Sequence, residues 1–403
     1  DPRKGLMPNL NPSFVKPRYD AGGFAGIPQR IRDAFASQQY DAVVLFLVDG
    51  FGWRFFERFQ DAPFLQRVAR DGRVEKLTSQ FPSTTAAHVT TIHTGLPVGR
   101  SGVYEWHYYE PSLDRMISPL LFSRAGDTVR DTLKKFKVDP ATLYPTRTIY
   151  QELADLGMHS HVFGMRDYTP STYSLQVMKG ADMHAFRTLP EALVNLGLEI
   201  EKQTSPAYFH FYFDKVDGIC HEYGPSAPQT EAEIETFLLV LENFFARVFK
   251  SRKRVLFLLT ADHGSSEVDP QTTIFLNTDP RFKGVERFFR SNRKGELLVP
   301  AGSARDMFLH VKDGLLDEAQ HFLSARLEGK ADVVKVEELI ENGYFGPTIS
   351  AEFRARVGNL VLLPYRGETT WWYVKDRFEQ KFYGHHGGLT PQEMEIPLLT
   401  LEV

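Results

Sequence analysis

Residues of the types that bind metal ions occur in short blocks that lie far apart in this chain of 403 residues. Each block follows, or lies close to, an apolar run typical of a buried strand. The carboxyl ends of parallel strands meet at one edge of a sheet, so we expect the blocks to converge there. This pattern is typical of a two-metal hydrolase. The blocks are Val43–Gly50, Phe81–Thr85, Asp217–His221, Val255–Gly264 and the closing His385–Gly388.

The first candidate ligands are carboxylates and an imidazole. Asp49 ends an apolar run before Gly50, although an Asp-Gly pair is also a common turn. Asp217 and His221 are four residues apart and would face the same side of a helix, where both could bind one cation. Each motif is weak alone, and their joint occurrence near strand ends favours a metal site.

The remaining candidates lie nearer the C-terminus. Asp262 and His263 follow an apolar strand, and a turn could bring both side chains onto one metal. His386 lies between His385 and two glycines, which allow close approach of the backbone. A purely structural role for the paired histidines is an equal alternative.

Thr85 is the candidate nucleophile. A threonine hydroxyl is inert at its ordinary pKa and needs a metal or a base to become an alkoxide. Ser83 and Thr84 are alternatives, or they cap the helix expected from Ala86. The positive N-terminus of that helix would lie beside the hydroxyl and could stabilise phosphoryl oxygens.

Taken together, the blocks resemble the alkaline phosphatase superfamily, in particular its type I phosphodiesterase/nucleotide pyrophosphatase family. The resemblance spans Asp41 to the C-terminus. The residues that carry it are Val48–Gly50, Phe81–Thr85, Thr94–Pro97, Asp217–Pro225, Thr260–Gly264 and His386–Gly388.

The resemblance implies two divalent metal ions beside the nucleophile, usually zinc, although such oxygen and nitrogen ligands also accept manganese or iron. In that arrangement Asp217, His221 and His386 hold one metal, and His385 is the less suitable histidine. The other metal is held by Asp49, Thr85, Asp262 and His263. The family commonly has an asparagine three residues after the nucleophile, and here that position is His88. His88 could still donate to a phosphoryl oxygen, but the difference weakens a specific nucleotide pyrophosphatase prediction.

The predicted function is therefore hydrolysis of phosphodiester or pyrophosphate bonds in small, nucleotide-like substrates through a phospho-threonine intermediate. A phosphomonoesterase on the same scaffold is the alternative, and it would need another cation for the extra negative oxygen. Arg166 or Lys215 could supply that cation. A non-catalytic binding module is a further alternative, although no ligand is missing. A sulfatase is disfavoured because the only cysteine, Cys220, lies inside the Asp-His block.

Composition limits the classes of partner that we expect and the compartments that suit the chain. The net charge of −4 without long basic runs argues against a nucleic-acid polymer as partner. No run approaches about 20 apolar residues, so we expect no membrane span. One cysteine excludes an internal disulfide and fits the cytoplasm. Because the sequence opens at Asp1, a removed leader and a periplasmic or secreted location are the alternative. The sequence does not indicate an oligomeric state.

The elements that must position these residues alternate between strand and helix. This order predicts an α/β fold with a mostly parallel sheet and helices on both faces, and the resemblance implies the alkaline phosphatase-like form. Residues 1–267 and 383–403 are expected to form the catalytic core, after an irregular arm over 1–26, and residues 268–382 a smaller α+β cap insert. The predicted helices are 27–38, 55–70, 86–94, 146–156, 230–249 and 316–328. The predicted strands are 43–48, 74–77, 161–164, 207–213, 255–259, 306–311, 360–363 and 395–401.

Overall fold

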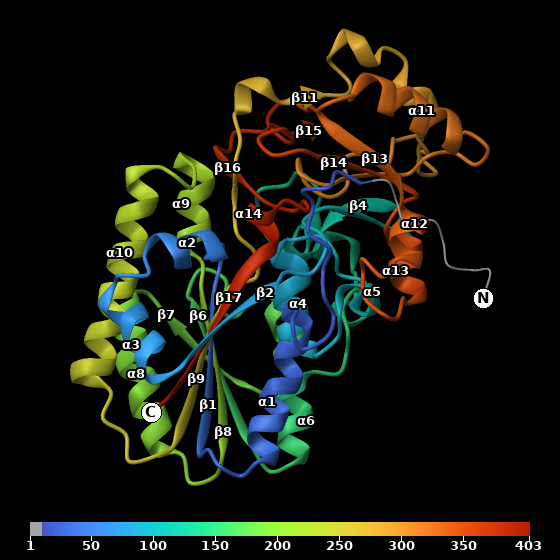
Figure 1. Cartoon of the computed structure of the whole chain (residues 1–403). Helices are drawn as coiled ribbons and strands as arrows, with labels where there is room; N and C mark the ends of the chain where they lie inside the picture. Colours follow the sequence, from blue (N-terminus) through green and yellow to red (C-terminus); the bar gives the residue numbers. More distant parts are fainter. Residues whose placement is uncertain (1–9) are drawn as a thin grey trace, which may run out of the picture.

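The longest apolar runs of the sequence form the centre of a seven-stranded sheet (Figure 1). The computed structural model describes residues 10–403, so the first nine residues of the predicted arm lie outside it. Strands β1 (Ala42–Val48) and β9 (Val255–Thr260) are buried along their whole length and pair in parallel. Such full burial explains why both read as unbroken apolar runs.

The other strands extend this pair in both directions. On one side, β8 (Ala207–Phe213), β6 (His159–Met165) and β7 (Asp182–Phe186) continue the sheet in parallel. On the other side, β17 (Glu395–Glu402) runs antiparallel between β9 and β2 (Arg73–Thr78). The order is β2-β17-β9-β1-β8-β6-β7, which confirms the predicted mostly parallel sheet.

Helices cover both faces of the sheet, as predicted (Figure 1). Helices α1 (Ile27–Ala36), α4 (Thr85–Thr94) and α6 (Ile149–Asp155) lie on one side. The other side carries α3 (Pro63–Asp71), α8 (Leu189–Lys202), α9 (Lys215–Tyr223) and α10 (Pro228–Asn243). The shorter helices are α2 (Trp53–Arg58), α5 (Val98–Ser101), α7 (Thr172–Val177) and α14 (Pro391–Met394).

Two predicted helices differ from the structure in their continuity. The segment 55–70 forms α2 and α3 rather than one helix, because Pro63 disfavours a helical conformation in the residue before it. The segment 230–249 is α-helical only to Asn243 and then widens into one π-helical turn over Phe244–Val248.

A small sheet not anticipated from the sequence lies between α5 and α6. It consists of β3 (Tyr108–Glu110), β4 (Arg115–Ser118) and β5 (Ser123–Arg124), all antiparallel. Its strands have two to four residues, too few for a clear alternation of apolar and polar side chains.

After β9 the chain builds a second group of elements above the carboxyl edge of the main sheet (Figure 1). Its centre is the sheet β12-β14-β13. The strands are β10 (Ser266–Glu267), β11 (Ile274–Phe275), β12 (Met307–Leu309), β13 (Ala331–Lys335), β14 (Leu360–Pro364), β15 (Thr370–Trp371) and β16 (Gly384–His385). The helices are α11 (Leu316–Arg326), α12 (Val336–Glu341) and α13 (Ala351–Arg356).

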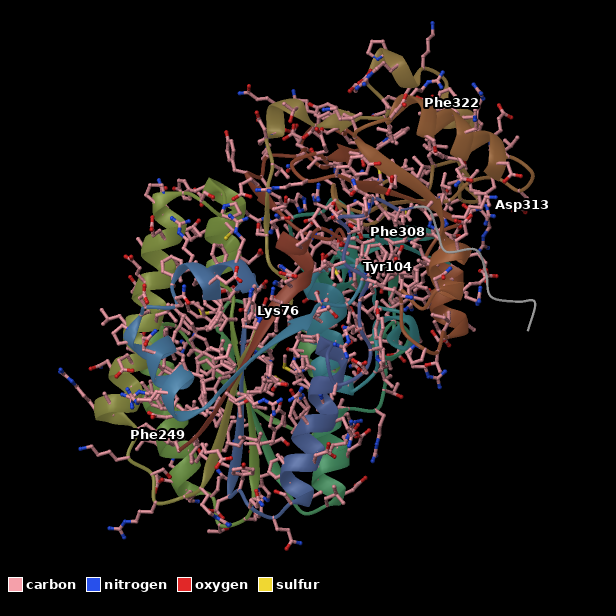
Figure 2. All side chains as sticks on the ribbon, in the orientation of Figure 1. Lys76, Tyr104, Phe249, Phe308, Asp313 and Phe322 are labelled. Atoms are coloured by element: carbon pink, nitrogen blue, oxygen red, sulfur yellow. The ribbon has the colours of Figure 1, made fainter. Side chains whose placement is uncertain are left out.

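The sheet β12-β14-β13 joins two hydrophobic clusters. Successive strand residues point to opposite faces, so Phe308 packs into the main core while Met307 and Leu309 pack into a second cluster within the insert. Phe308 meets Tyr104 edge-on, with ring centroids 5.1 Å apart, at the junction seen in Figure 2. This group of elements therefore shares part of its packing with the main hydrophobic core. Within residues 10–403 no helix combines the length and apolar character that a bilayer crossing requires.

Candidate functional site

The candidate ligands all come from the carboxyl edge of the sheet or from segments folded over it. Asp49 directly follows β1, and Asp262 and His263 follow β9. Asp217 lies in the first turn of α9, the helix after β8. The other two candidates are His221, one turn further along α9, and His386, just after β16.

These side chains form two overlapping clusters. Ligand atoms of Asp217, His263 and His386 lie within 4.8 Å of one another, and so do those of Asp49, Asp262 and His263. His221 reaches the first cluster through Asp217, because its Nε2 lies 3.0 Å from Asp217 Oδ2.

Thr85 lies beside both clusters. It is the first residue of α4, and its Oγ1 lies 3.2 Å from His263 Nε2. Ser83 is directed elsewhere, since its hydroxyl donates to the Gly388 carbonyl at 2.7 Å. Thr84 precedes the helix without a side-chain capping bond. The structure therefore brings the hydroxyl of Thr85 to the acid-histidine clusters.

Backbone carbonyls orient the three histidines. Nδ1 of His221 donates to Gly384 O at 2.7 Å, and Nδ1 of His263 donates to Gly264 O at 2.9 Å. Nδ1 of His386 donates to Ser83 O at 2.9 Å. Each bond fixes the ring so that Nε2 of the neutral imidazole could bind a metal, and such orienting contacts are usual for histidine ligands.

Three carboxyl groups are buried close together in the site. Asp49 and Asp217 are less than a tenth exposed, and Asp262 and His263 are fully buried. Asp49 Oδ1, Asp217 Oδ1 and Asp262 Oδ2 are buried without a hydrogen-bond partner among the described residues. A buried carboxylate oxygen is costly unless something compensates its charge.

The pKa values of these groups reflect the same burial of neighbouring charges. Burial, together with Asp262 and Asp217, raises the pKa of Asp49 well above its usual value. Burial lowers the pKa of His263, but the neighbouring carboxylates, Asp262 foremost, outweigh it and raise the pKa to about 10. Divalent cations would neutralise this cluster, and its oxygen and nitrogen donors suit zinc, manganese or iron. The residues present therefore fit a metal centre.

The backbone allows this crowding at Gly50. Its φ is +74°, in the left-handed region, and a Cβ atom there would lie 2.9 Å from the Cβ of Asp217. Glycine lets the chain turn after Asp49 and lets α9 approach. The Asp-Gly pair is thus both a turn and the support of a candidate ligand.

A cavity of about 770 Å³ opens beside the clusters. Phe382 lines it and stacks on His221 with ring centroids 4.2 Å apart. Among the aromatic residues that were ambiguous in the sequence, Trp106 and Trp371 line the cavity, whereas Tyr108 and Trp372 lie in hydrophobic clusters. The cavity can hold a drug-sized organic molecule.

Three of the candidate phosphate contacts do not face this cavity. His88 is fully buried, its Nε2 accepts from the Gln80 backbone N–H at 2.8 Å, and its Nδ1 lies 2.7 Å from Thr84 O. The prediction that His88 binds phosphate is wrong, because both ring nitrogens are engaged in supporting the loop before α4. Arg166 and Lys215 are exposed and are not part of the cavity wall. In this position neither side chain contributes to the wall of the cavity, where the extra cation suggested for a phosphomonoesterase would be needed.

Sequence reasoning missed the groups that support the ligands. Tyr212, near the end of β8, donates its hydroxyl to Asp49 Oδ2. Its position at the carboxyl end of a predicted strand was the available signal. Arg130 and Arg377 line the cavity, and both come from segments in which no helix or strand was predicted.

Comparisons with known proteins bear on the fold and on the family. The chain resembles the solved structure of murine ectonucleotide pyrophosphatase/phosphodiesterase 5, with 18% identity, a TM-score of 0.64, and coverage of 89% of this chain and 87% of that one. It also resembles phosphonoacetate hydrolase from Sinorhizobium meliloti 1021, solved with phosphonoformate, at 18% identity and a TM-score of 0.61, covering 90% of each chain. A search of curated protein sequences gave no match.

These structural similarities establish an alkaline phosphatase-like fold. The family assignment has its own support, because the model of type I phosphodiesterases and nucleotide pyrophosphatases matches residues 43–389. The match includes every candidate ligand from Asp49 to His386 and the hydroxyl of Thr85. The chain therefore belongs to the type I phosphodiesterase/nucleotide pyrophosphatase family of hydrolases.

Proposed function

We propose that this protein is a two-metal phosphodiesterase that cleaves small, nucleotide-like phosphodiesters or pyrophosphates through a phospho-threonine intermediate. One observation carries the proposal: the Oγ1 of Thr85 lies 3.2 Å from His263 Nε2, at the junction of two buried acid-histidine clusters. A hydroxyl in that position can be activated and can reach a bound phosphorus atom.

The proposed ligands divide into two groups. Asp217, His221 and His386 would hold one cation, most simply Zn²⁺, with Mn²⁺ or Fe as alternatives. The second cation would be held by Asp49, Thr85, Asp262 and His263. When bound, the two cations would lower the pKa of the threonine hydroxyl and stabilise the charge on the leaving oxygen.

The chain's own residues then account for the chemistry. Thr85 loses its hydroxyl proton to solvent, and its Oγ1 forms a bond to phosphorus as the bond to the leaving oxygen breaks. The first N–H groups of α4 have no capping side chain and would donate to the equatorial oxygens. Water then attacks the phosphorus, the bond to Oγ1 breaks, and Thr85 regains a proton.

The positions of the cationic side chains near the site favour cleavage of diesters over cleavage of monoesters. Arg166 and Lys215 lie outside the cavity wall, as described above. The arginines that do line the cavity keep their charge, but each donates to a backbone carbonyl outside the two clusters: Arg130 to Leu120 O at 3.1 Å and Arg377 to Ala125 O at 2.6 Å. A phosphodiester carries one negative charge fewer than a phosphomonoester, so its binding needs no further cation beside the phosphorus atom.

The cavity wall also suits a substrate with a flat ring. Trp106 and Phe382 are 38% and 41% exposed and offer aromatic faces beside the clusters. A structure of the inactive murine neighbour contains AMP, with 17% identity and a TM-score of 0.63. We propose that residues 268–382 act as a cap over this cavity, because Trp371, Phe378 and Phe382 belong to its wall.

The test compares hydrolysis of bis-p-nitrophenyl phosphate and p-nitrophenyl phosphate by the purified protein, before and after chelation. We expect the diester to be cleaved with the higher kcat/KM and both activities to disappear with the metal. A preference for the monoester would favour the phosphomonoesterase alternative. A metal-loaded protein that cleaves neither would favour a binding module. The cytoplasmic location stays a prediction.

A further inference from the structure

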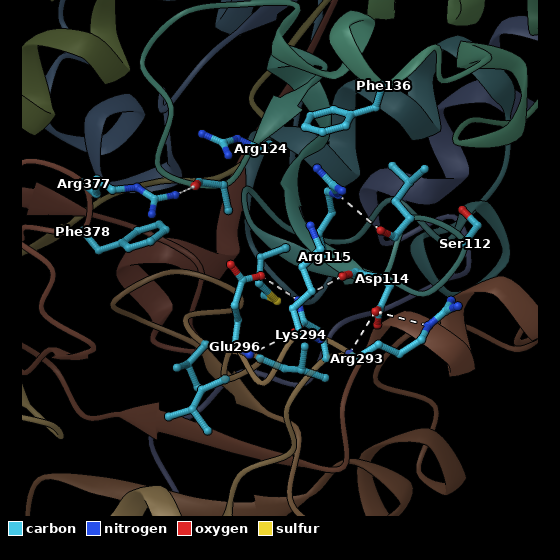
Figure 3. Close-up of a pocket in the computed structure, with 17 residues that line it drawn as sticks. Ser112, Asp114, Arg115, Arg124, Phe136, Arg293, Lys294, Glu296, Arg377 and Phe378 are labelled. Atoms are coloured by element: carbon cyan, nitrogen blue, oxygen red, sulfur yellow. Dashed lines mark hydrogen bonds and ion pairs between the residues drawn. The ribbon is translucent and has the colours of Figure 1, made fainter.

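A second cavity, of about 660 Å³, lies between the β3–β4–β5 sheet and the insert segment 292–299. Figure 3 shows its cationic side chains arriving from separate segments, with Arg124 and Arg377 on one side and Arg293 on the other. Five cationic side chains line it against two carboxylates. Because the whole chain carries a net charge of −4, this excess is local. The cations are Arg115, Arg124, Arg293, Lys294 and Arg377.

The two carboxylates are already engaged. Asp114 accepts from the Tyr109 hydroxyl at 2.8 Å and from the Arg293 backbone N–H at 3.0 Å, and it pairs with the Arg293 side chain at 3.3 Å. Glu296 accepts from Asn292 Nδ2 at 2.7 Å. Asp114 is therefore paired with Arg293, whereas Glu296 keeps its charge and forms no ion pair with a cation among the described residues, so the lining keeps a positive excess of five cations over two carboxylates.

Three of the cations have no carboxylate partner within residues 10–403: Arg115, Lys294 and Arg377. Arg124, by contrast, pairs with Asp127 at 3.2 Å. Unpaired cations that share a concave surface raise the local concentration of anions.

The guanidinium of Arg115 is held in place before any ligand arrives. Its central carbon lies 3.8 Å from the centroid of the Phe136 ring, and its Nε donates to Leu113 O at 3.2 Å. Stacking on an aromatic face fixes the plane of the guanidinium, which reduces the entropy lost when an anion binds. Figure 3 shows this ring over the cavity.

Apart from Ser112 and Asn292, the uncharged part of the wall is apolar. Met116, Leu297, Val299 and Phe378 line the cavity together with the exposed ring of Phe136. A bare inorganic ion would leave these side chains without a contact. The lining suits a ligand that combines several anionic groups with an organic body.

We propose that this basic cavity binds a small organic polyanion bearing phosphate groups. Its guanidinium and ammonium donors match phosphate oxygens, and its apolar wall matches the organic part. Binding there does not depend on the hydrolytic chemistry of the metal centre, so the two proposals can fail separately.

Arg377 and Phe378 line both this cavity and the one beside the metal centre, so the two cavities adjoin. The bound anionic groups can therefore come from either of two sources. The anionic groups can be the distal part of a substrate held at the metal centre, or they can belong to a separate molecule. The chemistry of recognition is the same in both cases.

Binding can be measured with pyranine, an aromatic trisulfonate, by fluorescence anisotropy on the metal-loaded protein. Sulfonates bind metals weakly, so the probe reports the basic cavity. We expect one saturable site whose affinity falls as salt is added. The double variant Arg115→Gln/Lys294→Gln should weaken binding by about tenfold or more. Both side chains lie outside the metal centre, and diester hydrolysis reports that the variant is folded.

Arg252→Gln is the matched control, because Arg252 is exposed and lies outside both cavities. It should bind pyranine as the parent does. Failure of the parent to bind pyranine, or equal affinity in the parent and the double variant, would overturn the proposal.

A competition experiment separates the two sources. If the cavity holds the distal part of a substrate, pyranine should raise the KM of a diester whose leaving group carries additional phosphates and should leave hydrolysis of bis-p-nitrophenyl phosphate unchanged. A separate ligand predicts the same response for both diesters. Binding that depends on Arg115 and Lys294 supports the proposal in either case.

Discussion

The imidazole rings of His263 and His386 lie face to face, with centroids 3.5 Å apart and planes at 11°. One follows a central strand and the other follows β16, near the end of the chain. Ligand atoms of both rings lie within 4.8 Å of the same Asp217 oxygen. Because His386 also donates to Ser83 O, this stacked pair links the two proposed metals to the loop that carries Thr85. The two metal groups should therefore not behave independently.

Replacing the proposed nucleophile gives the most direct prediction. Thr85→Ala should lower kcat for bis-p-nitrophenyl phosphate by about 10³-fold or more, because no other hydroxyl takes over the attack. Thr85→Ser should keep measurable turnover. Rapid acid quenching of the parent should trap a p-nitrophenyl phosphoryl group on the peptide that contains Thr85.

Ser83→Ala is the control for this series, since the hydroxyl of Ser83 donates to Gly388 O. It should keep both the metals and most of the turnover. If Thr85→Ala keeps its full kcat and no phosphoryl group is trapped in the parent, the nucleophile assignment is refuted.

Loss of one ligand should affect both metals because of the stacked histidines. His386→Gln should reduce bound metal below two ions per chain and lower kcat by about 100-fold or more, a larger effect than loss of an outer contact. Chelation of the parent should abolish activity and lower Tm, since buried carboxylates would lose their compensation. Elemental analysis and thermal melts measure both effects.

The neighbouring His385→Gln is the matched control, because His385 is equally buried but is absent from both clusters. Retention of two metals and full activity in His386→Gln would contradict the ligand assignment. Equal damage in the two variants would point to a general loss of structure.

The parts of the site that could be predicted from the sequence lie at the ends of obvious strands. The runs before Asp49 and Asp262 are apolar throughout because β1 and β9 are covered on both faces. The polar residues that follow such runs must emerge at the carboxyl edge. By contrast, β7 was missed because this edge strand has only one fully buried residue, Phe186.

The wrong predictions concern long-range packing. His88 lies on the first turns of α4 and could have faced the cavity, but its ring turns inward to the Gln80 N–H. Arg166 follows β6 at the correct edge, yet its side chain is exposed. The direction in which a side chain leaves a strand end depends on distant loops, which local spacing does not specify.

A buried histidine away from the site predicts how stability depends on pH. His210, in β8, is fully buried, and neither ring nitrogen has a partner among the described residues. Burial lowers its pKa from 6.5 to about 3. The depressed value means that stability is fully present above pH 6.5 and declines as pH falls toward 3. One unit below 6.5, protonation of the unfolded chain should cost about 1.4 kcal/mol.

In His210→Leu the new side chain is close to histidine in volume. This substitution should remove both the loss of stability at low pH and the two unpartnered ring nitrogens. Its Tm should exceed that of the parent, and the gap should widen between pH 7 and 5.5. His321→Leu, at an exposed position, should show no widening. A constant gap for His210→Leu would mean that the histidine is protonated in the folded protein.

The cavity wall gives a last prediction, about substrate binding. Phe382 stacks on His221, is 41% exposed and lines the cavity, so its ring can contact a substrate without touching the reacting phosphorus. Phe382→Ala should raise KM for an aryl diester by roughly threefold to tenfold with little change in kcat, because binding shared by the ground and transition states is lost. Tyr383→Ala is the matched control, since Tyr383 is 49% exposed but lies outside the cavity wall. If kcat falls instead while the metal content drops, the ring serves mainly to hold His221 in place.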